Sequence, residues 1–254
     1  MNPLGSIYKL YEMFLWRQIK GGPKPQHIGL ILDGNRRFAE SQGLISNEGH
    51  SVGSDTLEEF LGWCWKLDVR IITLFAFSTE NFNRADEEVS YLMELIQSRL
   101  VKLRQDPLIA EQQVKIRVIG RKENLPLEMN REINLIEAQT RDHERFQLNI
   151  ALSYGGRAEI IDAVKRIANE LLEQQLTVGD VTEDLMSRYL YTEGIPDPDL
   201  IIRTSGEERL SGFMLWQSAY SELYFTQVYW PAFRMIDFWR AIRTYQQRER
   251  RFGR

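Results

Sequence analysis

The most constraining feature of the sequence is a set of short, almost uninterrupted apolar runs. The run Ile71–Phe77 reads IITLFAF, which is the pattern of a strand that is covered on both faces. Five further segments have strand character, at 28–32, 115–120, 147–154, 200–202 and 222–226. Helical patterns lie between most of them, at 36–43, 54–67, 87–103, 127–141 and 158–175. This alternation predicts an α/β fold, a single domain with a mostly parallel six-stranded sheet flanked by helices.

A short amphipathic segment precedes the first strand. Apolar side chains between 6 and 20 fall close to one face of a helix, and Gly21-Gly22-Pro23 ends that helix. We therefore divide the chain into an N-terminal amphipathic helix (1–22) and a main domain (23–254). The helix either docks on the main domain or lies on a membrane surface, and its weakly basic polar face favours docking.

Composition and charge exclude several classes of protein. The 254 residues are 43% apolar and carry a net charge of -4, which argues against a dedicated nucleic-acid binder. Seven arginines fall between 234 and 254, and we interpret them as a solvated helix end or as a contact for RNA or membrane. Cys64 is the only cysteine, so no internal disulfide is possible. Without a membrane-spanning run or a signal-peptide pattern, the expected location is the cytoplasm, with peripheral contact to a membrane through the product as an alternative.

Polar side chains follow three of the predicted strands directly. The first strand is followed by Asp33, Asn35, Arg36 and Arg37, the second by Ser78, Thr79, Asn81 and Arg84, and the fifth by Arg203, Arg209 and Ser211. Parallel strands end at one edge of a sheet, so these groups can converge there. Arginines and hydroxyls around a carboxylate suit a diphosphate held by guanidinium forks, with Mg²⁺ between the carboxylate and the phosphate oxygens.

Two less specific interpretations of these residues stay open. Asp33-Gly34-Asn35 is also ordinary turn chemistry, with the following arginines as solvated helix residues. The apolar positions of the segment 87–103 mark one broad helix face, which either packs in the core or lines an apolar tunnel. Neither a Walker loop nor a G-x-G-x-x-G pattern follows a strand, which weakens nucleotide hydrolysis and dinucleotide binding.

Several long motifs in the sequence resemble those of the cis-prenyltransferases, also called undecaprenyl diphosphate synthase-like or Z-isoprenyl diphosphate synthases. The motifs span about residues 25 to 253 and are HIGLILDGNRRFA, Gly49-His50, LFAFSTENFNR, SYGGR, DLIIRTSGEERLSGFMLWQSAYSELYFTQVYWP and the C-terminal segment from Arg248 to Gly253. The resemblance implies a hydrophobic tunnel between sheet and helices, and a homodimer. It also implies Mg²⁺-dependent transfer of an allylic prenyl group to isopentenyl diphosphate, which forms a new cis double bond.

The same resemblance assigns roles to individual residues. Asp33 is expected to handle Mg²⁺ and the allylic diphosphate, which Gly34, Asn35, Arg36 and Arg37 would cradle. Asn81, with Ser78 and His50 nearby, is the expected group for the proton that leaves the second substrate. Arg203, Arg209 and Ser211 would hold isopentenyl diphosphate, and Glu222 resembles a second metal carboxylate. The remaining substrate-binding positions of the motifs are Phe38, Ser46, Thr79, Glu80, Phe82, Arg84 and Leu210. Arg251 and Gly253 match an element that reaches a partner subunit's site.

One position departs from the pattern of the resembled family. Ser46 stands four residues before His50, where the family usually has an arginine that grips the allylic diphosphate. This change allows an irregular reaction, in which two allylic diphosphates such as dimethylallyl diphosphate are joined away from the head-to-tail bond. A non-catalytic partner subunit is a further alternative, although Asp33, Asn81, Arg203 and Arg209 are all present. A nucleic-acid binder that uses the C-terminal arginines is a third, and the acidic charge disfavours it. Product length and the preferred primer are not predicted.

Overall fold

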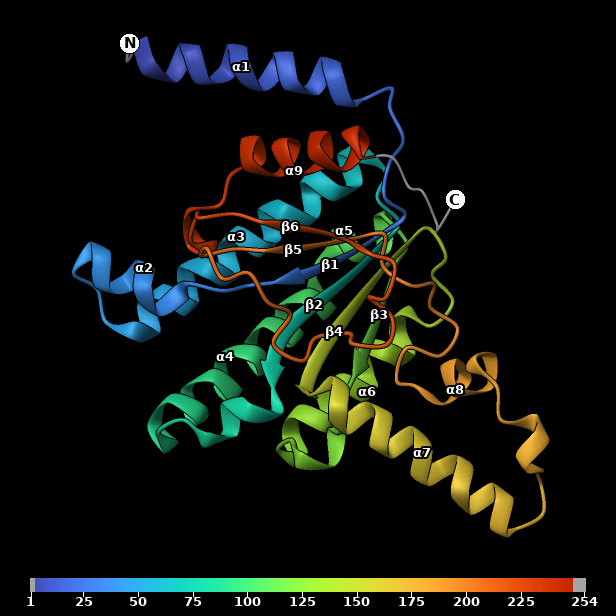
Figure 1. Cartoon of the computed structure of the whole chain (residues 1–254). Helices are drawn as coiled ribbons and strands as arrows, with labels where there is room; N and C mark the ends of the chain where they lie inside the picture. The colour runs from blue at the N-terminus through green and yellow to red at the C-terminus, as the bar shows by residue number, and fades with distance from the viewer. Residues whose placement is uncertain (1–2, 249–254) are drawn as a thin grey trace.

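Six parallel strands form the centre of the molecule (Figure 1). The computed structural model describes the backbone of residues 3–248 and the side chains of residues 8–248. Their order across the sheet is β3-β4-β2-β1-β5-β6, and every neighbouring pair is parallel. The strands are β1 (His27–Ile31), β2 (Ile71–Ser78), β3 (Val114–Ile119), β4 (Phe146–Tyr154), β5 (Leu200–Arg203) and β6 (Glu222–Phe225). The predicted α/β fold with a parallel six-stranded sheet is therefore confirmed.

Most of the helices follow the predicted segments, with differences at their ends. They are α1 (Pro3–Ile19), α2 (Asn35–Gln42), α3 (Ser46–Leu67), α4 (Asp86–Gln105), α5 (Pro107–Glu111), α6 (Leu127–Thr140), α7 (Gly156–Leu172), α8 (Glu183–Tyr189) and α9 (Met235–Gln247). The short 3-10 helices are η1 (Thr79–Asn83), η2 (Lys122–Asn124), η3 (Val178–Asp180) and η4 (Trp230–Ala232). The sequence did not predict α5 or α8, and it indicated α9 only as a solvated helix end, whereas α9 packs seven buried residues. Helix α5 begins where Asp106 accepts a hydrogen bond from the Leu108 amide (2.9 Å) and Pro107 occupies the first turn.

Helix α3 starts eight residues earlier than the apolar pattern predicts. Its first turns contain two glycines that let α2 approach closely. A Cβ atom at Gly49 would lie 2.2 Å from the carbonyl oxygen of Asn35, and one at Gly53 would lie 2.1 Å from the Asn35 side-chain oxygen. Because these turns pack through glycine against the backbone and the polar side chain of Asn35, they carry no apolar stripe for a sequence pattern to detect.

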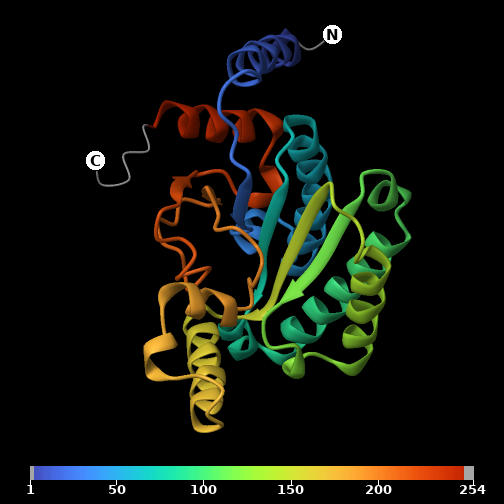
Figure 2. The same cartoon turned by 90° about the vertical axis from the view of Figure 1, so that its right-hand side faces the viewer.

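Two layers of helix and loop cover the two faces of the sheet (Figure 2). Side chains of the strands alternate between them, as the pleat requires. Leu30 and Leu74 pack into the large core under α3, α4, α6 and α9. Ile31 belongs to a smaller cluster on the opposite face, where Phe213 of the segment between β5 and β6 stacks on Phe75 (ring centroids 4.9 Å apart). Burial on both faces explains the near-continuous apolar strands.

Helix α1 lies against α9 at one end of the molecule (Figure 1). Leu15 and Ile19 are fully buried in the main core, and Trp16 packs on Trp239 with ring centroids 5.0 Å apart. The Lys66 ammonium group lies 5.0 Å from the Trp16 ring centroid, within cation–π range. The N-terminal helix thus docks on the body of the protein. Within residues 3–248, no helix combines the length and the hydropathy needed to cross a bilayer.

Candidate active site

A large cavity opens at the edge of the sheet where the strands end. Its volume is about 1320 Å³, which exceeds the ~300–1,000 Å³ of typical small-molecule sites. Residues that follow β1, β2, β4 and β5 line its polar part, and side chains of α3 and α4 line its apolar part. The convergence of polar residues that parallel strands predict is therefore present.

The turn after β1 is held by hydrogen bonds from two distant segments. The Thr204 hydroxyl accepts from the amide of Asp33 (3.0 Å) and donates to its carbonyl (2.6 Å). The Trp230 amide donates to the same carbonyl (3.0 Å). Gly34 has a φ of 102°, and a Cβ there would lie 2.8 Å from the Ser205 Cβ. Only glycine fits this turn without strain, so the position of Asp33 is tightly defined.

Asp33 and Arg203 form the central ion pair of the site. One carboxylate oxygen of Asp33 lies 2.8 Å from Nη2 of Arg203, and the other lies 3.5 Å from Nη2 of Arg37. Partial burial raises the pKa of Asp33, but the hydrogen bond and positive charge of Arg203 outweigh burial, so the net pKa is lowered. Arg203 also donates to the Ser211 hydroxyl (2.8 Å). Asp33 is consequently an anion at neutral pH.

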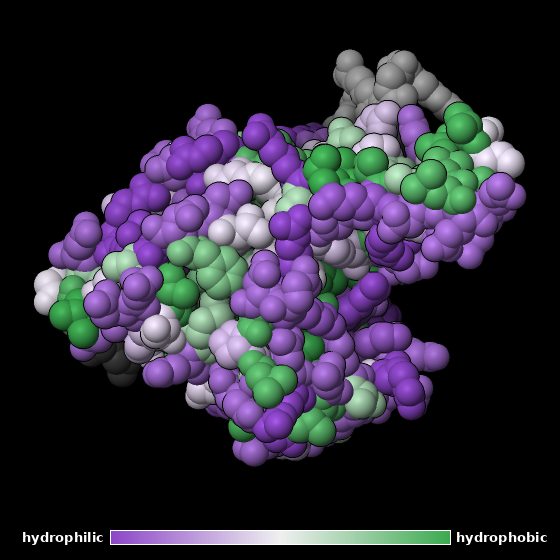
Figure 3. Space-filling model, turned by 90° about the horizontal axis from the view of Figure 1, so that it is seen from below, coloured by the Kyte–Doolittle hydropathy of each residue, from purple (hydrophilic) through white to green (hydrophobic). Residues whose placement is uncertain are grey.

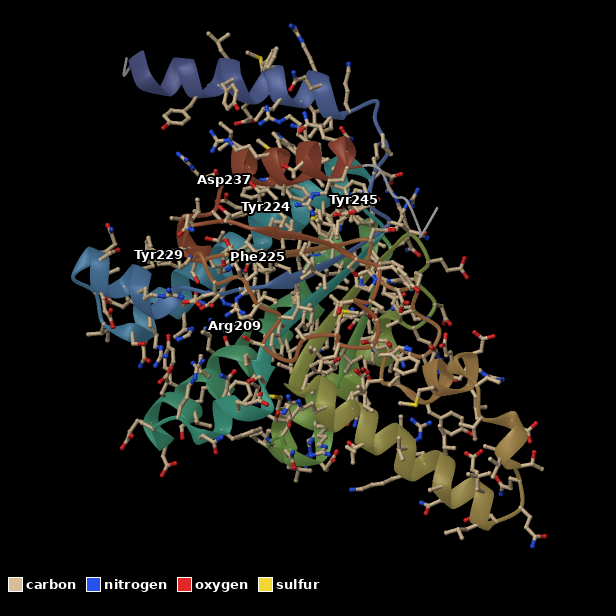
Figure 4. All side chains as sticks on the ribbon, in the orientation of Figure 1. Arg209, Tyr224, Phe225, Tyr229, Asp237 and Tyr245 are labelled. Carbon is tan, nitrogen blue, oxygen red and sulfur yellow. The ribbon has the colours of Figure 1, made fainter. Side chains whose placement is uncertain are left out.

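A second ionic contact joins the arginines that follow β1 to those that follow β5. Arg37 donates to the Ser205 hydroxyl (2.7 Å) and to the Glu207 carboxylate (3.1 Å). Glu207 also accepts a hydrogen bond from Arg209. Figure 4 shows Arg209 and Tyr229 on the side of the molecule where α2 follows β1, and the Arg37 guanidinium lies 5.8 Å from the Tyr229 ring centroid. Glu207 thus holds Arg37 and Arg209 near each other.

The polar residues after β2 lie in η1 and at the start of α4. The Asn81 side-chain oxygen accepts from the Ser78 amide (2.9 Å), which fixes its orientation. Glu88 accepts a hydrogen bond from Arg84 (2.8 Å) and lies 3.7 Å from Arg36 and 3.8 Å from His50. Burial, with the charge of Arg84, lowers the pKa of His50 to about 4. His50 is therefore neutral at pH 7, and its buried Nε2 atom has no hydrogen-bond partner among the described residues.

The cavity continues between α3, α4 and the sheet as an apolar chamber. Leu57 of α3 and Leu74 and Ile150 of the sheet form part of its wall. Helix α4 contributes Leu92, Leu95, Ile96, Leu100 and Leu103. The apolar face of α4 both packs in the core and lines the cavity, because Leu92 and Leu100 belong to the core cluster and are also part of the cavity wall. An apolar chamber continuous with a cationic opening suits a ligand with a charged head and a long apolar chain.

Most of the predicted site residues line this one cavity. They are Asp33, Gly34, Asn35, Arg36, Arg37, His50, Ser78, Thr79, Glu80, Asn81, Arg84, Arg203, Arg209 and Ser211. Five others do not line it, and Glu222 is one of them. Phe82 packs on Phe77 (ring centroids 4.9 Å apart), Leu210 packs in the cluster around Phe213, and neither Phe38 nor Ser46 faces the cavity. Arg251 and Gly253 lie outside the described residues.

Glu222 is not brought to Asp33. It is the first residue of β6 and pairs in register with Leu200, whereas Asp33 follows the far end of β1. Its carboxylate lies 2.6 Å from Nη1 of Arg248. Since a strand rises about 3.3 Å per residue, Glu222 and Asp33 are separated by most of the length of the sheet. Within one chain, the second metal carboxylate expected from the resemblance is not beside the first.

Several residues of the site escaped the sequence interpretation. Thr204 and Ser205 fix the turn and Arg37, Glu207 links two arginines, and Trp230 lines the cavity. The end of β4 adds Gly155, Gly156 and Arg157 to the lining, a fourth strand end where the sequence analysis used three. The only available signal was their place inside the long polar motif after β5 and the SYGGR motif.

The arrangement is compatible with a magnesium ion that arrives with a diphosphate. Residues 3–248 hold no group of three or more potential ligands of the His, Cys, Asp or Glu type. Mg²⁺ is commonly held by one or two carboxylates together with substrate phosphates. Asp33, an anionic carboxylate at the cavity surface, fits that role.

The fold and site define an α/β enzyme for substrates that combine a diphosphate with an apolar chain. Residues 31–253 match the prenyltransferase family described as "Putative undecaprenyl diphosphate synthase". The chain belongs to this family, the cis-prenyltransferases. It is accordingly an enzyme that extends an allylic prenyl diphosphate to a cis-polyprenyl diphosphate, and this principal prediction from the sequence is confirmed.

Relatives and solved structures of this kind cover nearly the whole chain. A protein of Thermoplasma acidophilum named tritrans,polycis-undecaprenyl-diphosphate synthase (geranylgeranyl-diphosphate specific) is 49% identical over 254 residues, which is 100% of this chain and 98% of that protein. An isoprenyl transferase of Thermus thermophilus is 52% identical over 252 residues, 98% of this chain and 96% of that protein. The crystal structure of lavandulyl diphosphate synthase from Lavandula x intermedia with dimethylallyl diphosphate has a TM-score of 0.87 and 33% identity, and covers 91% of this chain and 99% of that one.

Proposed function

We propose that the cavity edge binds two diphosphates, the allylic one beside Asp33 and Arg37 and isopentenyl diphosphate beside Arg203, Arg209 and Ser211. The observation that carries this proposal is the single cavity that joins both arginine groups to an apolar chamber. Ionisation of an allylic diphosphate places negative charge on the leaving group, and fixed guanidinium groups stabilise that charge without reorganisation. Mg²⁺ held by Asp33 would supply further charge neutralisation there.

The condensation also requires that a proton leave the isopentenyl unit. Asn81 and His50 are the proposed groups for this step, because both line the cavity and neither is charged at pH 7. The amide of Asn81 is oriented by the Ser78 backbone. His50 has a free nitrogen among the described residues and can accept a proton or orient a diphosphate oxygen that does so.

We propose geranylgeranyl diphosphate as the allylic primer and an undecaprenyl-length product. The support is the name of the Thermoplasma acidophilum relative, which is 49% identical over the full chain. The cavity volume of about 1320 Å³ also exceeds the ~300–1,000 Å³ of typical small-molecule sites, which favours a long primer. The test is to incubate the purified protein with Mg²⁺, labelled isopentenyl diphosphate and one primer of C10, C15 or C20 at a time. The highest kcat/KM should be with C20, and mass spectrometry should find a C55 product.

A second candidate is irregular coupling of two allylic units. Two observations favour it: Ser46 at the position of the usual arginine, and the structural likeness to lavandulyl diphosphate synthase bound to dimethylallyl diphosphate. The same incubation separates the two reactions. If product is labelled only when dimethylallyl diphosphate carries the label, and never when isopentenyl diphosphate carries it, the protein catalyses the irregular reaction and not regular elongation.

The protein is further proposed to act as a homodimer through α7. This helix exposes an apolar stripe in which Ile161 is 50%, Val164 48% and Leu172 82% exposed. Apolar side chains gather over this part of the surface in Figure 3. A monomer seldom leaves such a stripe in water. Light scattering should give twice the mass of the chain for the wild type and a smaller mass for Val164→Glu; a monomeric wild type would contradict the proposal.

A further inference from the structure

Helices α3 and α4 form the side wall of the apolar chamber and are joined by two polar bridges. The first lies near the opening, where the Tyr91 hydroxyl donates to the Asn47 carbonyl (3.0 Å). The second lies deeper and consists of Asp55 and Glu58 of α3 with Arg99 and Lys102 of α4. We call these four residues the α3–α4 clamp. The reaction described above does not use them.

The clamp is a continuous network of charge-assisted hydrogen bonds. Arg99 donates through Nη2 to Asp55 (2.8 Å) and through Nη1 to Glu58 (3.0 Å). Lys102 donates to both carboxylate oxygens of Glu58, at 2.6 and 2.8 Å. Two cations therefore face two anions across the boundary between the helices, and Glu58 is shared by both cations.

The position of Arg99 connects this network to the cavity. Arg99 lines the chamber among apolar residues of the same helix, such as Ile96, Leu100 and Leu103. It lies 13 residues beyond the first residue of α4, Asp86, which is about 20 Å along the helix axis. The Arg99 side chain is 25% exposed and Lys102 is 57% exposed. Arg99 therefore links the lining of the chamber to the three other clamp residues, which are exposed to solvent.

We propose that the α3–α4 clamp is a gate that sets the length of the product. When the clamp is closed, the end of a growing apolar chain meets the stem of Arg99 and cannot pass between α3 and α4. When the clamp opens, the chain end leaves the chamber through this boundary and a further unit is added. Ion pairs at exposed positions are individually weak and are screened by salt, so little free energy is needed to open the gate. The inference rests on the proposed binding of the growing chain in this cavity.

The test uses the double variant Asp55→Asn/Glu58→Gln. It removes both negative charges but keeps the Arg99 stem in the wall, so no cavity is created. Its matched control is Arg131→Gln, which removes an exposed ion pair with Glu128 on α6, away from the cavity. Each protein is incubated with labelled isopentenyl diphosphate and a C20 primer, and product lengths are resolved by mass spectrometry. Thermal melting checks that each variant is folded.

The double variant should raise the ratio of the next longer product to the wild-type product about fivefold, while Arg131→Gln leaves it unchanged. Raising the salt from about 0.1 to 1 M shortens the Debye length from ~10 to ~3 Å, and should lengthen the wild-type products but not those of the double variant. If both proteins make the same products at both salt concentrations, the gate is refuted. The salt series on the wild type is sufficient for this conclusion, because it does not depend on the folding of the double variant. A wild type that makes no polyprenyl product instead overturns the proposed function.

Discussion

The charge on Asp33 is the feature of this site whose removal has the most definite consequence. The variant Asp33→Asn keeps the shape of the side chain and one oxygen acceptor for Arg203, but removes the negative charge. Arg203 is only 5% exposed and Asp33 is 28% exposed. Breaking a fully buried pair costs about 3–5 kcal/mol, and partial exposure and the retained acceptor reduce the expected loss of folding stability to about 1–2 kcal/mol.

The loss of activity in Asp33→Asn should be larger than the loss of stability. Removing one electrostatic group from a preorganised site lowers kcat by about 10²–10³-fold, which corresponds to roughly 3–4 kcal/mol. Incorporation of labelled isopentenyl diphosphate measures the rate, and urea titration measures the free energy of unfolding. Asp142→Asn, whose side chain is 90% exposed, is the control and should change neither. A folded Asp33→Asn protein that turns over at nearly the wild-type rate would refute the reasoning.

Three further outcomes are expected. Ser46→Arg should lower KM for the allylic diphosphate by about tenfold, the worth of one charged hydrogen bond, in steady-state assays with varied primer; an unchanged KM would count against the role of this position. Gly49→Ala should cost about 1–3 kcal/mol in a thermal melt, because its Cβ would lie 2.2 Å from the Asn35 carbonyl; a neutral effect would contradict the close packing of α2 on α3. Burial raises the pKa of Glu159 in the folded state. The protonated form therefore stabilises the folded protein below the unfolded pKa of about 4.3, and this stability is lost as the pH rises through the folded pKa. The stability of Glu159→Gln should therefore improve relative to the wild type as pH rises, and parallel pH curves would exclude this.

Ser46 illustrates how one position links substrate choice to local structure. It is the first residue of α3, and its buried hydroxyl has no hydrogen-bond partner among the described residues. A guanidinium group at this point would lie in the same turn as His50 and near the Glu88 carboxylate that already pairs with Arg84. The chain instead pairs Glu88 with Arg84 and Arg36, and Ser46 adds no charge to this cluster.

The sequence by itself determined the parts of the protein that depend on local pattern and on general rules for parallel sheets. Strands such as Ile71–Ser78 are near-continuous apolar runs because helices or loops cover both faces. Parallel strands must end at one edge, so Asp33, Asn81 and Arg203 could be placed together without coordinates. The family followed from motifs long enough to be specific.

Only the tertiary structure decided which side chains meet across long stretches of chain. Glu222 lies at the opposite end of its strand from the site, because the register of β6 depends on the 18-residue segment between Arg203 and Glu222, which has no repeating pattern. The bridge of Glu207 between two arginines cannot be read from the sequence. The apolar stripe of α7 through Ile161 and Val164 can be, but its exposure cannot. An apolar helix face looks the same in sequence whether it packs in the core, lines a cavity or remains in solvent, since all three satisfy the same periodicity and differ only in what packs against it.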